Sequence, residues 1–195
     1  VKKALVCHKP ERVPEFMDTA FRIAGSGRPG PVYLELPVDV LNGQVEETTV
    51  KKIQTKVQSK PVDLEKCKDL LEMIGKAVRP VAIAGSGTWY ADAGEELREF
   101  AERTGMPVFT STLGRGTLPD PHPICFESSL AIRPGAAMFA NMNADLVLFL
   151  GNRMSLYYIF GDIFNKEAKI IQVDIEPEEI GRTRSVDLGI VSDLK

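Results

Sequence analysis

The strongest constraint on the fold is the uninterrupted apolar run Leu-Val-Leu-Phe-Leu at residues 146–150. A strand with one face in water alternates apolar and polar residues, and this run does not alternate. We therefore expect a strand that is buried on both faces. Further strands are expected at residues 80–84, 107–110, 170–174 and 188–191. Because segments with helical spacing separate these strands, the sequence predicts an α/β fold with an open parallel sheet and helices on both faces.

The segments between the strands carry helix and turn signals. Asp63 is a predicted N-cap for a helix whose apolar stripe is Leu64, Cys67, Leu70, Leu71 and Ile74. The motif 85–87 is expected to be a turn, and the helix after it should bury Ala93 and end at Gly105. We expect a Gly- and Pro-rich loop at 112–123 and a short helix at 134–141. The acidic run 176–179 is interpreted as the solvated start of a helix rather than as a metal site.

The chain divides into three stretches of different character. Residues 1–41 predict a strand–helix–strand unit, with the helix at 13–24 and the last strand at 32–36. Residues 42–61 are polar, with few large apolar side chains, and are interpreted as a linker. Residues 62–195 contain the alternating strands and helices and are expected to form the second domain.

Composition excludes several classes of protein. The formal net charge of −3 provides no basic excess for nucleic acid, and no apolar run is long enough to span a membrane. Three widely spaced cysteines argue against a disulfide framework, so we expect a cytoplasmic protein. The chain starts at Val1 with neither a signal peptide nor an initiating Met. A cut from a longer protein and processing of the N-terminus explain the missing Met equally well.

Candidate ligand-binding residues follow the predicted strands, because open parallel sheets bind ligands at the carboxyl ends of their strands. These residues are Gly85, Ser86, Gly87, Asn152, Arg153, Asp174, Ile175 and Asp193. The glycines would let the backbone approach a phosphate, Arg153 would pair with that phosphate, and Asp174 would accept bonds from a ribose. Two alternatives stay open. The Gly-x-Gly motif lacks the third glycine of a dinucleotide fingerprint and is as consistent with a tight turn, and Asp174 could instead cap a helix.

Catalytic motifs of the common hydrolases, P-loop proteins and zinc proteases are absent from the sequence. His122 stands in a Pro-rich turn, where we expect a packing or surface role rather than a catalytic one. We therefore predict no catalytic and no metal-binding residue in this chain.

Longer stretches of the sequence resemble one family. Residues 20–40, with their core Gly-Arg-Pro-Gly-Pro-Val, closely resemble the end of the pyrimidine-binding domain of thiamine-diphosphate enzymes of the acetolactate synthase type. Residues 79–87, 144–153 and 171–177 resemble the Rossmann-like central domain of the same enzymes, and Glu-Ile-Gly-Arg at 179–182 is similar to the ending found in acetolactate synthases. The resemblance covers nearly the whole chain in the same order.

This resemblance implies a parent enzyme that decarboxylates or joins 2-oxoacids. The alternatives are an oxalyl-CoA decarboxylase or 2-hydroxyacyl-CoA lyase, or a free-standing protein that binds FAD or NAD. Thiamine diphosphate and magnesium would bind elsewhere in the parent, so the chain alone would be inactive. The family places FAD or ADP in the central domain, and Arg28 matches the arginine that reaches this nucleotide. The substrate would be a 2-oxoacid or an acyl-CoA, and the assembly a homodimer or homotetramer.

Two segments depart from the pattern of acetolactate synthases that bind flavin. Residues 125–129 read Cys-Phe-Glu-Ser-Ser where those enzymes have Gly-Met-His-Gly-Thr, and residues 153–157 read Arg-Met-Ser-Leu-Tyr where they have Arg-Phe-Asp-Asp-Arg. These departures weigh against flavin. Residues 151–161 instead resemble the acyl-CoA lyase branch.

Overall fold

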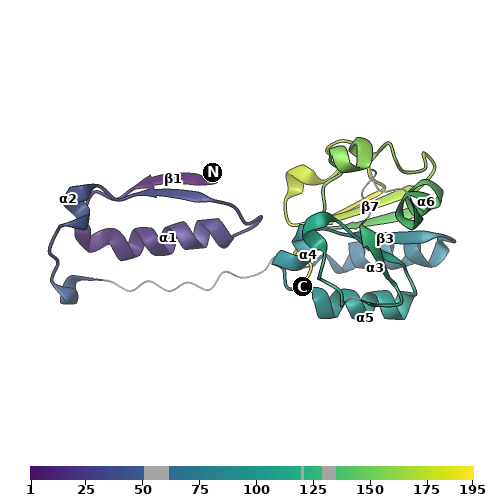
Figure 1. Cartoon of the computed structure of the whole chain (residues 1–195), viewed down its shortest axis with the longest axis horizontal. Helices are drawn as coiled ribbons and strands as arrows, with labels where there is room; N and C mark the ends of the chain where they lie inside the picture. The colour runs from purple at the N-terminus through teal and green to yellow at the C-terminus, as the bar shows by residue number, and fades with distance from the viewer. Residues whose placement is uncertain (51–61, 120, 129–134) are drawn as a thin grey trace. The chain divides into compact units, whose positions relative to one another are not determined.

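The computed structural model describes residues 1–50, 62–119, 121–128 and 135–195. The chain consists of two compact units, Val1–Ser59 and Lys60–Lys195. Figure 1 draws both units, and each is described here by itself. Most of the predicted linker lies outside the described residues.

The N-terminal unit is a strand–helix–strand motif. Its elements are β1 (Lys3–Val6), η1 (Pro10–Arg12), α1 (Val13–Gly25), β2 (Val32–Glu35), α2 (Val38–Leu41) and η2 (Glu47–Thr49). β1 and β2 pair in parallel, with Lys3 opposite Val32. Pro14 lies in the first turn of α1, where its missing N–H would have no helical partner. The predicted helix and last strand of this unit are confirmed.

The C-terminal unit contains one six-stranded sheet. Its strands are β3 (Pro80–Ala84), β4 (Val108–Thr110), β5 (Cys125–Ser128), β6 (Leu146–Leu150), β7 (Lys169–Asp174) and β8 (Leu188–Val191). Their order is β5-β4-β3-β6-β7-β8, and every pairing is parallel. The direction of winding reverses between β3 and β6, which makes this the switch point of a doubly wound sheet.

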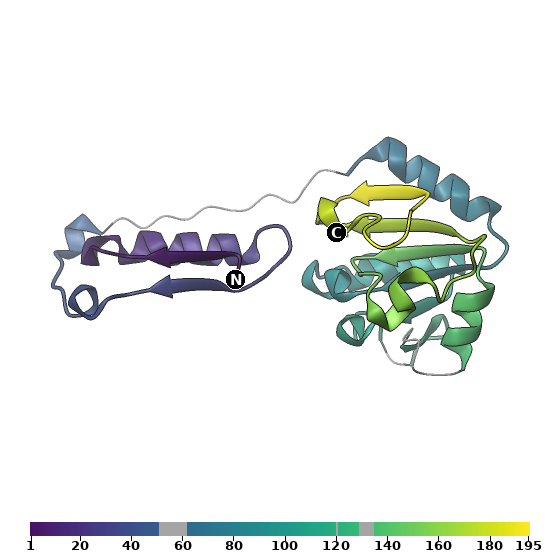
Figure 2. The same cartoon turned by 90° about the horizontal axis from the view of Figure 1, so that it is seen from above.

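Each central strand sends successive side chains into two separate cores. On β6, Val147 and Phe149 enter one core, and Leu146 and Leu148 enter the other. α3 (Leu64–Lys76) and α5 (Gly94–Thr104) cover the second core, while α6 (Ala136–Asn143) and η4 (Leu156–Gly161) cover the first. Figures 1 and 2 show helices on both sides of the sheet. The predicted fold class is therefore confirmed.

The first helical connection differs from the prediction. Ser86 and Gly87 belong not to a turn but to the short helix α4 (Ser86–Tyr90), for which Gly85 is the N-cap. The chain then breaks at Asp92, whose φ of 52° cannot continue a helix, and α5 starts after the buried Ala93. Gly105 ends α5 in the left-handed conformation, as predicted.

Three other details also differ. Leu64 and Leu71 of α3 are exposed because α3 contacts the second core through Leu70, Met73 and Ile74 instead. β5 was not predicted, since Cys-Phe-Glu-Ser carries no apolar run. The acidic run forms η5 (Pro177–Glu179), in which Glu179 is buried rather than solvated. The remaining short element, η3 (Thr112–Gly114), lies within the predicted Gly- and Pro-rich loop.

Candidate functional site

The loops after β3 and β6 meet at the switch point of the sheet. The N–H of Gly85 donates to the carbonyl of Leu150 at 2.8 Å, and the N–H of Gly87 donates to the carbonyl of Gly151 at 2.9 Å. A Cβ on Gly87 would lie 2.6 Å from Gly151 Cα, so glycine is required for the two loops to touch. Both predicted glycines thus direct their N–H groups at protein carbonyls.

Ser86 and Asn152 lie beside this contact. Ser86 is half-buried at the first position of α4. The side-chain amide of Asn152 donates to the hydroxyl of Tyr158 at 2.8 Å. Tyr158 is buried and packs against Phe149 and Phe164. Asn152 therefore anchors η4 to the loop that follows β6.

Arg153 lies at the same edge of the sheet and forms an ion pair. Its Nε is 2.7 Å from Oε1 of Glu179, which is only 7% exposed. Arg182 reaches both oxygens of this carboxylate through Nη1, each at 3.3 Å. A buried carboxylate is strongly unfavourable without such partners, so two arginines compensate for its burial. We call this group the Arg153–Glu179–Arg182 cluster. The sequence did not reveal it, because nothing local links residue 153 to residue 179.

The predicted residues at the ends of β7 and β8 lie close together, because these two strands are neighbours in the sheet. The buried carboxylate of Asp174 accepts a hydrogen bond from the N–H of Glu176 at 2.9 Å. The following helix, η5, has Glu176 as its N-cap, so Asp174 does not cap it. Ile175 follows, half-buried. The N–H of Ser192 donates to the carbonyl of Asp174 at 3.1 Å.

Ser192 and Asp193 directly follow β8, the edge strand of the sheet. Ser192 Oγ is buried and has no hydrogen-bond partner within the described part of the chain. The carboxylate of Asp193 accepts from the N–H groups of Leu194 and Lys195. Buried polar atoms nearly always have a partner, so the Ser192 hydroxyl is a candidate contact for a ligand hydroxyl.

Arg28 belongs to the other unit. It lies half-buried between α1 and β2, and its carbonyl accepts from Nζ of Lys2 at 3.0 Å. The structure thus brings together the candidates of the C-terminal unit at one sheet edge, while Arg28 remains a prediction.

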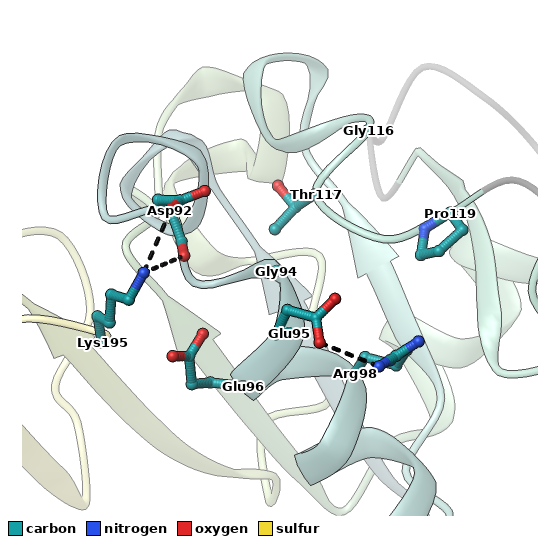
Figure 3. A pocket seen from close by; sticks show the side chains of 9 residues that line it. All are labelled: Asp92, Gly94, Glu95, Glu96, Arg98, Gly116, Thr117, Pro119 and Lys195. Carbon is teal, nitrogen blue, oxygen red and sulfur yellow. Dashed lines mark hydrogen bonds and ion pairs between the residues drawn. The ribbon is translucent and has the colours of Figure 1, made fainter.

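A pocket of about 380 Å³ opens at the start of α5 (Figure 3). Its lining residues are Asp92, Gly94, Glu95, Glu96, Arg98, Gly116, Thr117, Pro119 and Lys195. Both cations of this lining are engaged with carboxylates, Lys195 with Asp92 and Arg98 with Glu95, as the dashed lines in Figure 3 mark. None of the residues predicted from the sequence lines this pocket.

The described residues include no group of three or more His, Cys, Asp or Glu side chains placed to hold a metal ion. Nor do they include a helix that is long and apolar enough to cross a membrane.

At the edge formed by residues 151–193, side chains rather than glycine N–H groups are the candidate ligand contacts. Arg153 is partly exposed beside the buried Glu179, and Asp174 and Ser192 are buried at the ends of β7 and β8. The orphaned Ser192 hydroxyl is the observation that favours a ligand here. The N–H groups of Gly85 and Gly87 are already used.

Comparisons with known proteins agree with this architecture. Residues 67–195 match the family described as "Thiamine pyrophosphate enzyme, central domain". The chain is 36% identical over 191 residues to the acetolactate synthase large subunit of Corynebacterium glutamicum, covering 95% of this chain and 30% of that protein. It is 35% identical over 199 residues to the glyoxylate carboligase of Escherichia coli O157:H7, covering 100% of this chain and 33% of that protein.

A solved structure extends the agreement to three dimensions. The benzoylformate decarboxylase of Polynucleobacter necessarius superposes with a TM-score of 0.81 at 27% identity, covering 100% of this chain and 36% of that one. The chain spans about a third of the length of the curated relatives that it matches. On these grounds, the chain belongs to the thiamine pyrophosphate enzyme family, and residues 67–195 are its central domain.

Proposed function

We propose that this chain is part of a thiamine-diphosphate-dependent enzyme that decarboxylates or joins 2-oxoacids, in the manner of an acetolactate synthase. The observation that carries the proposal is the match to carboligases over almost the whole chain, including the 66 residues before the central-domain match begins. In this proposal residues 1–41 are the end of the pyrimidine-binding domain, and residues 42–61 link it to the central domain.

The chain itself would contribute a scaffold rather than the reaction centre. Thiamine diphosphate with magnesium, bound elsewhere in the enzyme, would supply the nucleophilic carbon that attacks the 2-oxoacid. The two cores on either side of the sheet would hold the carboxyl-end loops in place. We propose that the 195-residue chain alone does not turn over substrate, and that the enzyme is a cytoplasmic homodimer or homotetramer.

We further propose that FAD or ADP binds at the carboxyl edge of the sheet. Arg153 would contact a phosphate, and Asp174 and Ser192 would contact sugar hydroxyls. Asn152, Ile175 and Asp193 would line the same edge. Arg28 matches the family's nucleotide-contacting arginine by sequence alone. The loop Gly85–Gly87 would border the ligand without donating hydrogen bonds through Gly85 or Gly87, because both N–H groups already bond to protein carbonyls.

One observation favours the acyl-CoA branch as a second candidate. Leu156 and Tyr157, which are 70% and 54% exposed, replace charged residues that flavin-binding acetolactate synthases carry after this strand. Together with the resemblance of residues 151–161 to the acyl-CoA lyase branch, this replacement supports the second candidate.

Two experiments test these proposals. Purified full-length enzyme should consume pyruvate only when thiamine diphosphate and magnesium are added, and turnover without them would refute the family chemistry. Separately, the 195-residue chain should be titrated with FAD, ADP and coenzyme A by calorimetry. Preference for FAD would support the acetolactate synthase branch, and preference for ADP or coenzyme A the acyl-CoA branch. Binding of none would refute a nucleotide site in this chain by itself.

A further inference from the structure

We propose that Arg182 is a further ligand-binding residue, and that Glu179 holds Arg153 and Arg182 together as a two-arginine receptor for one phosphate group. This inference rests on the proposed nucleotide site at the carboxyl edge and assigns its anion contact. Sequence analysis pointed to Arg153 as the phosphate-pairing side chain of the C-terminal unit and did not point to Arg182.

The geometry of the Arg153–Glu179–Arg182 cluster leaves donors available on both arginines. Arg153 uses Nε for its 2.7 Å contact with Glu179, and Arg182 uses Nη1 for its two 3.3 Å contacts. These contacts do not use Nη1 and Nη2 of Arg153 or Nε and Nη2 of Arg182. A guanidinium has five N–H donors in a planar fork, so each arginine retains a pair of groups suited to an oxyanion.

Exposure separates the roles of the three side chains. The side chain of Glu179 is 8% exposed, whereas those of Arg153 and Arg182 are 45% and 60% exposed. The carboxylate therefore lies beneath two guanidinium groups that reach solvent. An anionic ligand can approach the arginines from outside without displacing Glu179.

Charge favours a single anionic group. Two cations and one carboxylate leave the cluster with a net charge of +1. Without Glu179, the two guanidinium groups would repel each other and lose a common anchor. With it, their positions are set before a ligand arrives, which reduces the entropy lost on binding.

Further contacts fix the loops that carry the cluster. The hydroxyl of Thr183 donates to the carbonyl of Met154 at 3.0 Å, next to both arginines in sequence. The N–H of Gly181 donates to Oε1 of the buried Gln172 at 3.0 Å. The first bond joins the loops after β6 and β7, and the second holds the loop after β7 to strand β7 itself. Both fix backbone beside the cluster, as a preformed binding site requires.

The test is a calorimetric titration of the 195-residue chain with inorganic pyrophosphate and with ADP. We expect both probes to bind, and Arg182→Gln to weaken each at least tenfold. Arg103→Gln is the matched control, because it removes the same charge from an ion pair on the exposed face of α5. It should change neither affinity by more than twofold. Pyruvate tests for a bare carboxylate and should bind at least tenfold more weakly than pyrophosphate.

Glu179→Gln decides between two roles for the buried carboxylate. If Glu179 positions the arginines, this variant binds pyrophosphate more weakly than the wild type. Tighter binding would mean that Glu179 competes with the ligand, and would overturn the proposed role. A circular dichroism spectrum that matches the wild type shows that the variant is folded, and Glu179→Asp provides a second, charge-conserving variant if it is not.

Three other outcomes would overturn the receptor: no binding of either phosphate probe, unchanged affinity in Arg182→Gln, or pyruvate binding as tightly as pyrophosphate. These results are separable from the proposed function, which is measured as cofactor-dependent pyruvate consumption by the full-length enzyme. If phosphate binding fails this test but the full-length enzyme still consumes pyruvate, only the proposed anion site is refuted. Loss of turnover with the receptor intact would remove the 2-oxoacid assignment only.

Discussion

The backbone N–H of Gly87 donates a hydrogen bond of 2.9 Å to the carbonyl oxygen of Gly151. This bond joins the loops after β3 and β6 where the sheet reverses its direction of winding. A Cβ on Gly151 would lie 2.5 Å from Gly87 Cα, and the φ of Gly151 is 55°. Close backbone contact therefore explains why both positions are glycine, whether or not a ligand binds nearby.

Gly87→Ala should destabilise the C-terminal unit by about 1–3 kcal/mol, because its Cβ would overlap backbone that cannot move aside easily. Urea denaturation followed by the fluorescence of Trp89, the only tryptophan in the chain, measures the effect. Gly75→Ala in α3 is the control, since a Cβ there meets nothing within 4 Å. It should stabilise by about 0.5–1 kcal/mol. A Gly87→Ala protein as stable as the wild type would contradict the close contact.

Phe149→Ala should have a larger effect. Phe149 is fully buried and makes edge-on contacts with Tyr158 and Phe164. Removing its ring leaves a cavity beneath η4, with an expected loss of about 3–5 kcal/mol in the free energy of unfolding. Phe139→Ala on α6 is the matched change, because Phe139 is 70% exposed and should cost no more than about 0.5 kcal/mol. Similar losses in both variants would show that Phe149 is not a core residue.

The sheet could be predicted because continuous apolar runs report burial on both faces. Residues 146–150 became β6 and 188–191 became β8, with the predicted bounds. β5 could not be predicted, since it pairs with β4 as a short strand of mixed composition. Its place depends on the neighbouring strand more than on its own sequence.

The position of the candidate residues in the fold was predictable, but their contacts were not. Topology alone places residues after β3, β6, β7 and β8 at one edge. The burial of Glu179 contradicts the solvated position that an acidic run suggests, because its ion pair with Arg153 joins residues far apart in sequence. No spacing rule relates these two positions, so only the fold reveals the cluster.

Ile159 offers a test of backbone conformation. Its φ and ψ are 50° and 44°, a left-handed geometry that is unfavourable for a β-branched residue. Since the side chain is 50% exposed, its removal should lose little burial energy. Ile159→Gly should therefore be more stable than Ile159→Ala by about 1 kcal/mol. In α3, Lys68→Gly should be less stable than Lys68→Ala by a similar amount, about 1 kcal/mol. Urea denaturation gives both comparisons, and the same order at both positions would exclude the left-handed geometry.

Asp145 should make stability depend on pH. Its carboxylate accepts from the N–H groups of Val78 and Arg79 at 2.7 and 2.8 Å, which ties the start of β3 to the start of β6. Burial raises the pKa of the Asp145 carboxyl, but these hydrogen bonds to the charged form outweigh burial, so the pKa lies below its ordinary value.

The sign of the effect follows from that direction. A folded-state pKa below the unfolded value means that the unfolded chain binds the proton first as pH falls. The contribution of Asp145 is therefore complete at pH 7, declines below the unfolded pKa of about 4, and is lost as pH falls through the folded pKa. Asp145→Asn should cost about 1–2 kcal/mol at pH 7, where charged hydrogen bonds are lost, and progressively less below pH 4. Urea denaturation at pH 7, 5, 4 and 3 measures this, with Asp69→Asn on the exposed face of α3 as the control. A cost for Asp145→Asn that stays constant from pH 7 to 3 would contradict the lowered pKa.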